Sequence, residues 1–163
     1  MFAVSAPSPA TAKPDAYAGL LAQAKALLEG ERDAGANAAN LAALLFHGLP
    51  DLNWAGFYWL KDGGLVLGPF QGKPACVRIA LGQGVCGAAA AARRTVVVPD
   101  VHAFPGHIAC DSASESEIVV PVLQGGRLAG VLDLDSPRRG RFDEEDARGL
   151  EALVAHFAGA TDL

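Results

Sequence analysis

The sequence predicts a single α+β domain in which helices cover a central antiparallel sheet. Apolar residues recur at helical spacing near both ends of the chain, whereas its middle carries short apolar runs joined by glycine-containing turns. With 163 residues, 51% of them hydrophobic, the chain is long enough to bury one core. Helices outside a run of hairpin-linked strands give this fold class.

Three main helices are predicted, two before the strands and one after them. The first runs from Asp15 and places its apolar residues three and four positions apart. The second begins near Asn37 and ends at Gly48-Leu49-Pro50. The third begins after Asp143, which can cap it together with Asp146 three residues later.

The predicted strands lie between these helices and form two hairpins. Residues 53–60 and 65–70 flank a Lys61-Asp62-Gly63-Gly64 turn, and residues 117–123 and 127–135 flank a Gln124-Gly125-Gly126 turn. Two further short strands, over residues 78–80 and 95–98, are separated by an alanine-rich helix from Val85. Residues 99–116 have no clear periodicity, and so long a connection in a compact domain is usually functional or disordered.

Charge and composition exclude several classes of protein. The formal net charge is −5 with no basic stripe, which argues against a nucleic-acid partner. No apolar run approaches the ~20 residues that cross a bilayer, so no membrane association is expected. The N-terminal residues lack the features of a signal peptide, and three cysteines are too few for a disulfide scaffold. We therefore expect a cytoplasmic protein with a disordered leader over residues 1–14 and one domain over residues 15–163.

Two aspartates share one face of a predicted strand in Gly130-Val131-Leu132-Asp133-Leu134-Asp135-Ser136. Side chains alternate along a strand, so Asp133 and Asp135 point to one side and lie roughly 7 Å apart. If that face is buried, the two carboxylates need a cation, hydrogen-bond donors or a proton. The alternative is a solvated outer face, and the strand alone leaves both open.

A second patterned strand lies in Asn53-Trp54-Ala55-Gly56-Phe57-Tyr58-Trp59. Trp54, Gly56 and Tyr58 share a face, and the glycine leaves a gap between two aromatic walls. This arrangement suits a slot for an apolar group beside a tyrosine hydroxyl, although ordinary core packing explains it equally well.

The cysteines at positions 76, 86 and 110 point to sulfur chemistry. Cys86 follows Gly82-Gln83-Gly84-Val85 at a helix start, where backbone amides lower a thiol pKa or receive an anion. Cys110 lies in the unassigned segment, in His107-Ile108-Ala109-Cys110-Asp111. Inert core cysteines are one alternative. A zinc site is another, because His107 and Cys110 are three positions apart and His102, Cys76 and Cys86 could complete a ligand set, but the paired spacings of zinc sites are missing. We therefore predict no metal site.

Taken together, these stretches resemble the free methionine-(R)-sulfoxide reductases. The resemblance extends over roughly residues 49–146 and departs from that family at Ala80, Leu81 and Gln83. Six stretches carry it: Asn53-Trp54-Ala55-Gly56-Phe57-Tyr58, Leu67-Gly68-Pro69-Phe70-Gln71-Gly72-Lys73, Gly84-Val85-Cys86-Gly87, Gly106-His107-Ile108-Ala109-Cys110-Asp111, Ser116-Glu117-Ile118-Val119-Val120-Pro121, and the strand that holds Asp133 and Asp135. The resemblance implies a GAF-like fold with a six-stranded antiparallel sheet flanked by helices.

The resemblance also implies roles for individual side chains. Cys110 becomes the nucleophile and Cys76 the thiol that resolves its oxidised form, with Cys86 as an accessory or alternative partner. Either Glu117 or Asp135 donates the proton to the departing oxygen. The substrate-binding residues would be Trp54, Tyr58, Glu117, Asp133 and Asp135.

The implied substrate is free L-methionine-(R)-sulfoxide, which carries an α-ammonium group that acidic side chains can bind. Thioredoxin would reset the enzyme, with no metal or organic cofactor, and a homodimer is favoured. The alternative function is a non-catalytic GAF domain that senses a small molecule.

Overall fold

The computed structural model describes residues 2–108 and 111–163. The elements follow one another along the chain in this order: α1 (Lys13–Leu27), α2 (Ala34–Gly48), β1 (Trp54–Lys61), β2 (Gly64–Gly72), β3 (Arg78–Ala80), α3 (Gly84–Ala92), β4 (Val96–Val98), the 3-10 helix η1 (Val101–Ala103), β5 (Ser116–Gln124), β6 (Arg127–Ser136) and α4 (Glu144–Ala160).

The six strands form one sheet in the order β3-β2-β1-β6-β5-β4, and each neighbouring pair is antiparallel. This confirms the predicted α+β class and six-stranded sheet. Both predicted hairpins form across two-residue turns, Asp62-Gly63 and Gly125-Gly126. All four turn residues have positive φ values, between 50° and 79°, as tight hairpin turns of this kind require.

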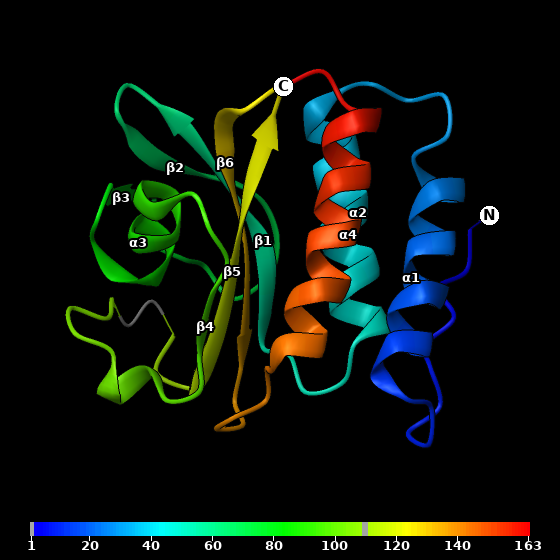
Figure 1. Cartoon of the computed structure of the whole chain (residues 1–163), viewed down its shortest axis with the longest axis horizontal. Helices are drawn as coiled ribbons and strands as arrows, with labels where there is room; N and C mark the ends of the chain where they lie inside the picture. The colour runs from blue at the N-terminus through cyan, green and yellow to red at the C-terminus, as the bar shows by residue number, and fades with distance from the viewer. Residues whose placement is uncertain (1, 109–110) are drawn as a thin grey trace.

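Three helices form layers on one side of the sheet, as Figure 1 shows. α2 and α4 pack against the strands, and α1 packs against α4 and α2 on their outer side. The main core lies between these helices and the sheet. Its sheet side includes Phe57 of β1, Ile118 of β5, and Leu132 and Leu134 of β6. Phe57 meets Phe157 of α4 with ring centroids 4.9 Å apart.

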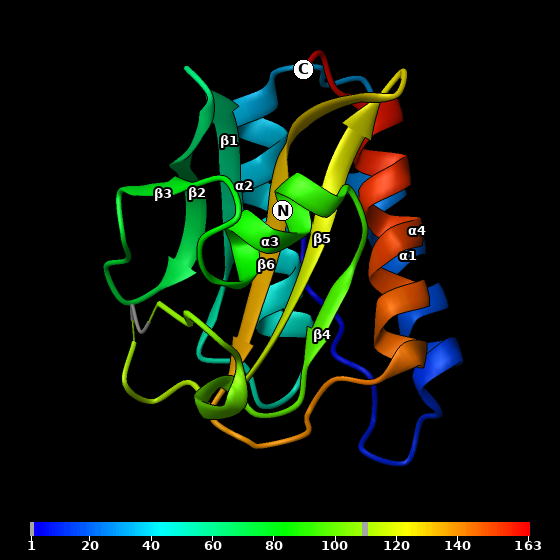
Figure 2. The same ribbon diagram turned by 60° about the vertical axis from the view of Figure 1, so that its left-hand side comes forward.

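The opposite side of the sheet carries α3 and the connection that runs from β4 to β5 (Figure 2). A second core forms there, where Val85 and Ala89 of α3 pack with Val119 and Val131 of the sheet. Because strand side chains alternate, Asp133 and Asp135 point to this second side while Leu132 and Leu134 point to the first.

The helix starts show how local hydrogen bonds set the boundaries. α1 begins at Lys13, two residues before the predicted start, because a proline fits in the first helical turn. α2 begins at Ala34 rather than near Asn37, because the Asp33 side chain accepts a hydrogen bond from the Ala36 amide at 2.8 Å. The predicted Asp143 cap of α4 is present.

Residues 2–12 contain no helix or strand, and Ser5 exchanges two hydrogen bonds with the Gln23 side chain of α1. Within residues 2–108 and 111–163, no helix combines the length and apolar character needed to span a membrane.

Candidate active site

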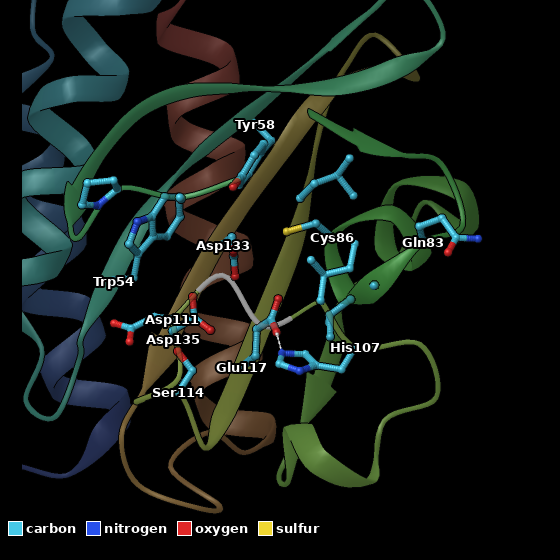
Figure 3. Close-up of a pocket in the computed structure, with 16 residues that line it drawn as sticks. Trp54, Tyr58, Gln83, Cys86, His107, Asp111, Ser114, Glu117, Asp133 and Asp135 are labelled. Atoms are coloured by element: carbon cyan, nitrogen blue, oxygen red, sulfur yellow. Dashed lines mark ion pairs between the residues drawn. The ribbon is translucent and has the colours of Figure 1, made fainter. Parts of the chain in front are cut away.

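A pocket opens on the second side of the sheet, between β1, β6 and β5 on one wall and the start of α3 on the other. Figure 3 shows side chains from these elements converging on it. Six of the residues predicted from the sequence line this pocket: Trp54, Tyr58, Cys86, Glu117, Asp133 and Asp135. The sheet register explains why Trp54 and Asp135, which are far apart in the chain, meet here.

Three carboxyl groups form the floor of the pocket. Asp135 of β6 lies opposite Glu117 of β5 and Trp54 of β1, so these three side chains form one row across the sheet. Asp133 occupies the next inward-facing position and lies opposite Gly56 and Val119. Glu117 and Asp133 are each only 6% exposed, which excludes the solvated outer face that the strand pattern left open.

Burial dominates the ionisation of this cluster. It raises the pKa of Glu117, of Asp133 and of Asp135 well above ordinary carboxyl values, and mutual repulsion adds to the effect. A hydrogen bond involving Ser114 partly opposes the rise in the pKa of Asp135. A carboxyl group with a raised pKa keeps its proton to a higher pH than an ordinary one, which suits this cluster to general acid catalysis.

Aromatic rings of β1 line one side of the pocket. Trp54 stacks on Phe70 of β2 with centroids 5.3 Å apart and on Tyr58 with centroids 5.9 Å apart. The gap above Gly56 is filled: a Cβ atom there would lie 2.7 Å from the Trp54 ring and 2.3 Å from the Phe70 side chain. Of the two readings that the sequence pattern left open, core packing holds above Gly56, and the open space lies beyond these rings, beside Cys86 and the carboxyl groups.

Cys86 lies in the first turn of α3 and is buried and free. Its position at a helix start led us to expect a lowered thiol pKa, and this expectation is wrong. Burial raises the pKa of Cys86 well above its ordinary value, and the charges of Asp133 and Glu117 raise it further. The geometry therefore favours a neutral thiol at this position.

The other two cysteines occupy different settings. Cys76 lies in the connection between β2 and β3, half-buried, and its carbonyl accepts a hydrogen bond from the Tyr58 hydroxyl at 3.0 Å. Cys110 lies outside the described residues. The nearest described residues on either side of it, Ile108 and Asp111, both line the pocket.

The sequence did not predict the roles of two polar residues of the pocket: His107 as a partner of Glu117, and Asp111 as a member of a hydrogen-bonded group at the pocket edge. His107, considered there only as a metal ligand, places its Nε2 atom 3.5 Å from Glu117 Oε2. Burial lowers the pKa of His107, which favours a neutral imidazole. A Glu117 partner could not be predicted from sequence, because the two side chains meet only when the connection between β4 and β5 folds over the sheet.

Asp111 belongs to a hydrogen-bonded group at the pocket edge. Asn53 Nδ2 donates to Asp111 Oδ2 at 3.2 Å and to Ser114 Oγ at 3.0 Å. A hydrogen bond from the Ala113 amide is the main cause of the lowered pKa of Asp111. The local signal was available, since an aspartate that accepts from the amide two residues later is a common turn motif.

The pocket also brings together groups that can bind a cation. Ligand atoms of Cys86, Glu117 and Asp133 all lie within 4.8 Å of one another. This set differs from the histidines and cysteines that the sequence suggested as a possible zinc site.

Known proteins share this architecture and sequence. The model of the GAF domain family matches residues 36–162. The free methionine-R-sulfoxide reductase of Escherichia coli is 54% identical over 145 residues, which cover 89% of this chain and 88% of that protein. The Neisseria meningitidis free methionine-R-sulfoxide reductase, solved in complex with its substrate, is 44% identical with a TM-score of 0.92, over 98% of this chain and 95% of that chain. A Burkholderia vietnamiensis protein described as a candidate GAF sensor is 60% identical with a TM-score of 0.90, over 93% and 96% of the two chains.

These matches extend over nearly the whole chain, and their sequence identities are well above the level at which only a fold is shared. They agree with the family resemblance drawn from the motifs around the three cysteines. The chain belongs to the free methionine-R-sulfoxide reductase family of GAF-domain proteins.

Proposed function

We propose that this protein reduces free L-methionine-(R)-sulfoxide to methionine, with Cys110 as the nucleophile. The observation that carries the proposal is the buried carboxyl cluster, which faces a thiol and an aromatic wall in one pocket. The family relationship supports the same oxidoreductase activity, because the E. coli and N. meningitidis relatives are named for it.

The pocket suits each part of the zwitterionic substrate. Its carboxyl groups can bind the α-ammonium group, and the backbone amides at the start of α3 can receive the α-carboxylate. Gln83, Gly84 and Val85 line this end of the pocket. Trp54 and Tyr58 offer an apolar surface to the methyl group on sulfur.

The proposed chemistry proceeds in three balanced steps. The Cys110 thiolate attacks the sulfoxide sulfur, Glu117 or Asp135 protonates the sulfoxide oxygen, and methionine leaves while Cys110 becomes a sulfenic acid. A second cysteine attacks this sulfur and releases water, forming a disulfide. A dithiol such as thioredoxin then exchanges with the disulfide and restores both thiols. No metal or organic cofactor takes part.

We assign the resolving role to Cys76 before Cys86. Cys86 is buried and its pKa is raised, so little of it is thiolate at neutral pH. Cys76 is half-buried and follows Pro74 and Ala75, which line the pocket. We further propose that residues 15–163 act as one catalytic domain, in the cytoplasm and as a homodimer.

A coupled assay with thioredoxin, thioredoxin reductase and NADPH tests the activity. We expect turnover with the free R epimer and little with the S epimer or with peptide-bound sulfoxide. Cys110→Ser should abolish turnover, and Cys76→Ser should release one methionine per protein and then stop. Absence of turnover with the R epimer would favour the sensor function of a GAF domain instead.

A further inference from the structure

The thiol of Cys86, which the proposed reductase steps do not need once Cys76 resolves Cys110, converges with two carboxyl groups of the pocket. Their ligand atoms lie within 4.8 Å of one another, and all three residues are buried. Figure 3 shows the Cys86 sulfur and the carboxyl groups of Glu117 and Asp133 turned towards a common space. Three ligands that converge from α3, β5 and β6 form the first requirement of a metal site.

A second observation indicates that this space favours a ligand. Oδ1 of Asp133 is buried and has no hydrogen-bond partner within the described residues, and the side-chain hydrogen bonds of this carboxyl group are with Cys86 and Glu117, the other two members of the cluster. A buried carboxylate oxygen without a donor is costly, and a cation would satisfy it. Within residues 2–108 and 111–163, His107 is the one basic side chain in close contact with the cluster, and it contacts Glu117 rather than Asp133.

The donor set identifies the class of cation. One sulfur and two carboxylate oxygens suit Zn²⁺ and related thiophilic dications, whereas Mg²⁺ and Ca²⁺ select oxygen ligands alone. A tetrahedral Zn²⁺ site needs ligand atoms roughly 3.3–3.8 Å apart, given Zn–O and Zn–S bonds of about 2.1 and 2.3 Å. The ligand atoms here lie within 4.8 Å of one another, so they must move closer when the metal binds, and the His107 imidazole next to Glu117 offers a fourth ligand.

We infer that Cys86, Glu117 and Asp133 bind Zn²⁺ or Cd²⁺, and that the bound metal excludes the substrate from the pocket. The exclusion rests on the proposed function, because it assumes that the same carboxyl groups bind the substrate ammonium group. Metal binding itself does not depend on that assumption. The site is inhibitory rather than catalytic, because a dication there occupies the acidic groups and displaces the protons that they would donate.

The binding test isolates Cys86 as the single thiol. In a Cys76→Ser/Cys110→Ser background, Cd²⁺ is titrated into the protein and the thiolate-to-cadmium absorption in the ultraviolet is followed. We expect one Cd²⁺ per chain, displaced by Zn²⁺, with no absorption band once Cys86→Ser is added. Because the ligands give up protons on binding, the apparent affinity should rise by about tenfold per pH unit for each proton released.

Two further variants separate this site from unspecific binding. Asp133→Asn, which keeps the thiol, should weaken Cd²⁺ binding at least tenfold, and Glu117→Gln provides the same test if Asp133→Asn does not fold. The matched control is His102→Ala, which disrupts a separate surface group of Asp100, His102 and Glu115 with similar spacing and should leave the band unchanged. Absence of the band, or equal affinity in both carboxyl variants and their parent, would overturn the inference.

Competition tests the overlap with the substrate. Free methionine-(R)-sulfoxide cannot react with the Cys110→Ser background, so it should lower the apparent Cd²⁺ affinity as an equilibrium competitor. If saturating substrate leaves the apparent Cd²⁺ affinity unchanged, the bound metal does not exclude the substrate from the pocket. If cadmium binds as expected but wild-type protein shows no turnover, the proposed function fails and the metal site stands. If the wild-type protein turns over but does not bind cadmium, the metal site fails and the proposed function stands.

Discussion

Replacing Asp133 by asparagine is expected to stabilise the folded protein while it abolishes reductase activity. The carboxyl group is buried next to Glu117, and its pKa is raised well above the ordinary value. As pH rises, such a group keeps its proton in the folded chain at pH values where the same group is already ionised in the unfolded chain. Folding stability therefore falls as pH rises between the unfolded and folded pKa values. Asparagine keeps the shape of the side chain and removes this penalty.

The magnitude follows from proton linkage. For one carboxyl group, the difference in unfolding free energy between variant and wild type should widen by up to about 1.4 kcal/mol per pH unit above the unfolded pKa of about 3.9. For a chain of this length, that corresponds to about 3–6 °C in Tm per pH unit.

Urea denaturation followed by circular dichroism at pH 5, 6, 7 and 8 measures this difference. Asp62→Asn is the matched control, because Asp62 is exposed in the β1–β2 turn and its φ of 50° suits asparagine. The control should show a difference from wild type that stays constant with pH. Two results would contradict the reasoning: an Asp133→Asn protein that is no more stable than wild type at pH 8, or a difference in unfolding free energy that does not grow with pH. Either would mean that burial does not disfavour the charged form of Asp133.

Three predictions concern the helix layer, and each is checked by denaturation. Gly149→Ala should destabilise the protein by about 3 kcal/mol, because its Cβ would lie 2.1 Å from the ring of Tyr17. Gly19 is exposed in α1, and a Cβ atom there would have no other atom within 4 Å, so Gly19→Ala should instead stabilise the protein by about 0.5–1 kcal/mol. A loss of stability would contradict the free space around Gly19. Asp146→Ala should cost about 3–5 kcal/mol, because it removes the buried partner of Arg141 and of the Tyr17 hydroxyl, at 3.0 and 2.8 Å; a cost below 1 kcal/mol would argue against that network.

The sheet and its hairpins were predictable because their signals are local. The Asp62-Gly63 and Gly125-Gly126 turns need positive φ values, which glycine and aspartate tolerate, and both sit between apolar runs. The alternation around Asp133 also predicted correctly which side chains share a face. Whether that face was buried was not predictable, because it depends on α3 and on residues after β4, which have no periodic signal of their own.

The errors arose where tertiary contacts outweigh local ones. The helix start at Cys86 suggested a reactive thiol, but burial beside Asp133 and Glu117 outweighs the favourable backbone amides. Gly56 left a slot and core packing both open, and Phe70 from the neighbouring strand fills the space. The pairing of His107 with Glu117 depends on how the connection between β4 and β5 crosses the sheet, which no pattern in the sequence specifies.

The proposed preference for the free amino acid follows from the same electrostatics that destabilise the empty pocket. Burial and mutual repulsion raise the pKa values of Glu117, Asp133 and Asp135, so a ligand with an ammonium group favours the ionised form of these carboxyl groups. A peptide-bound methionine sulfoxide has no such charge and would not favour that ionised form. A substrate that binds only the folded protein at about 100 times its Kd would add about 2.7 kcal/mol to the unfolding free energy. Binding should also release protons from the cluster, so proton uptake by the buffer, measured by calorimetry in buffers of different ionisation enthalpy, distinguishes recognition of the ammonium group from simple filling of an apolar pocket.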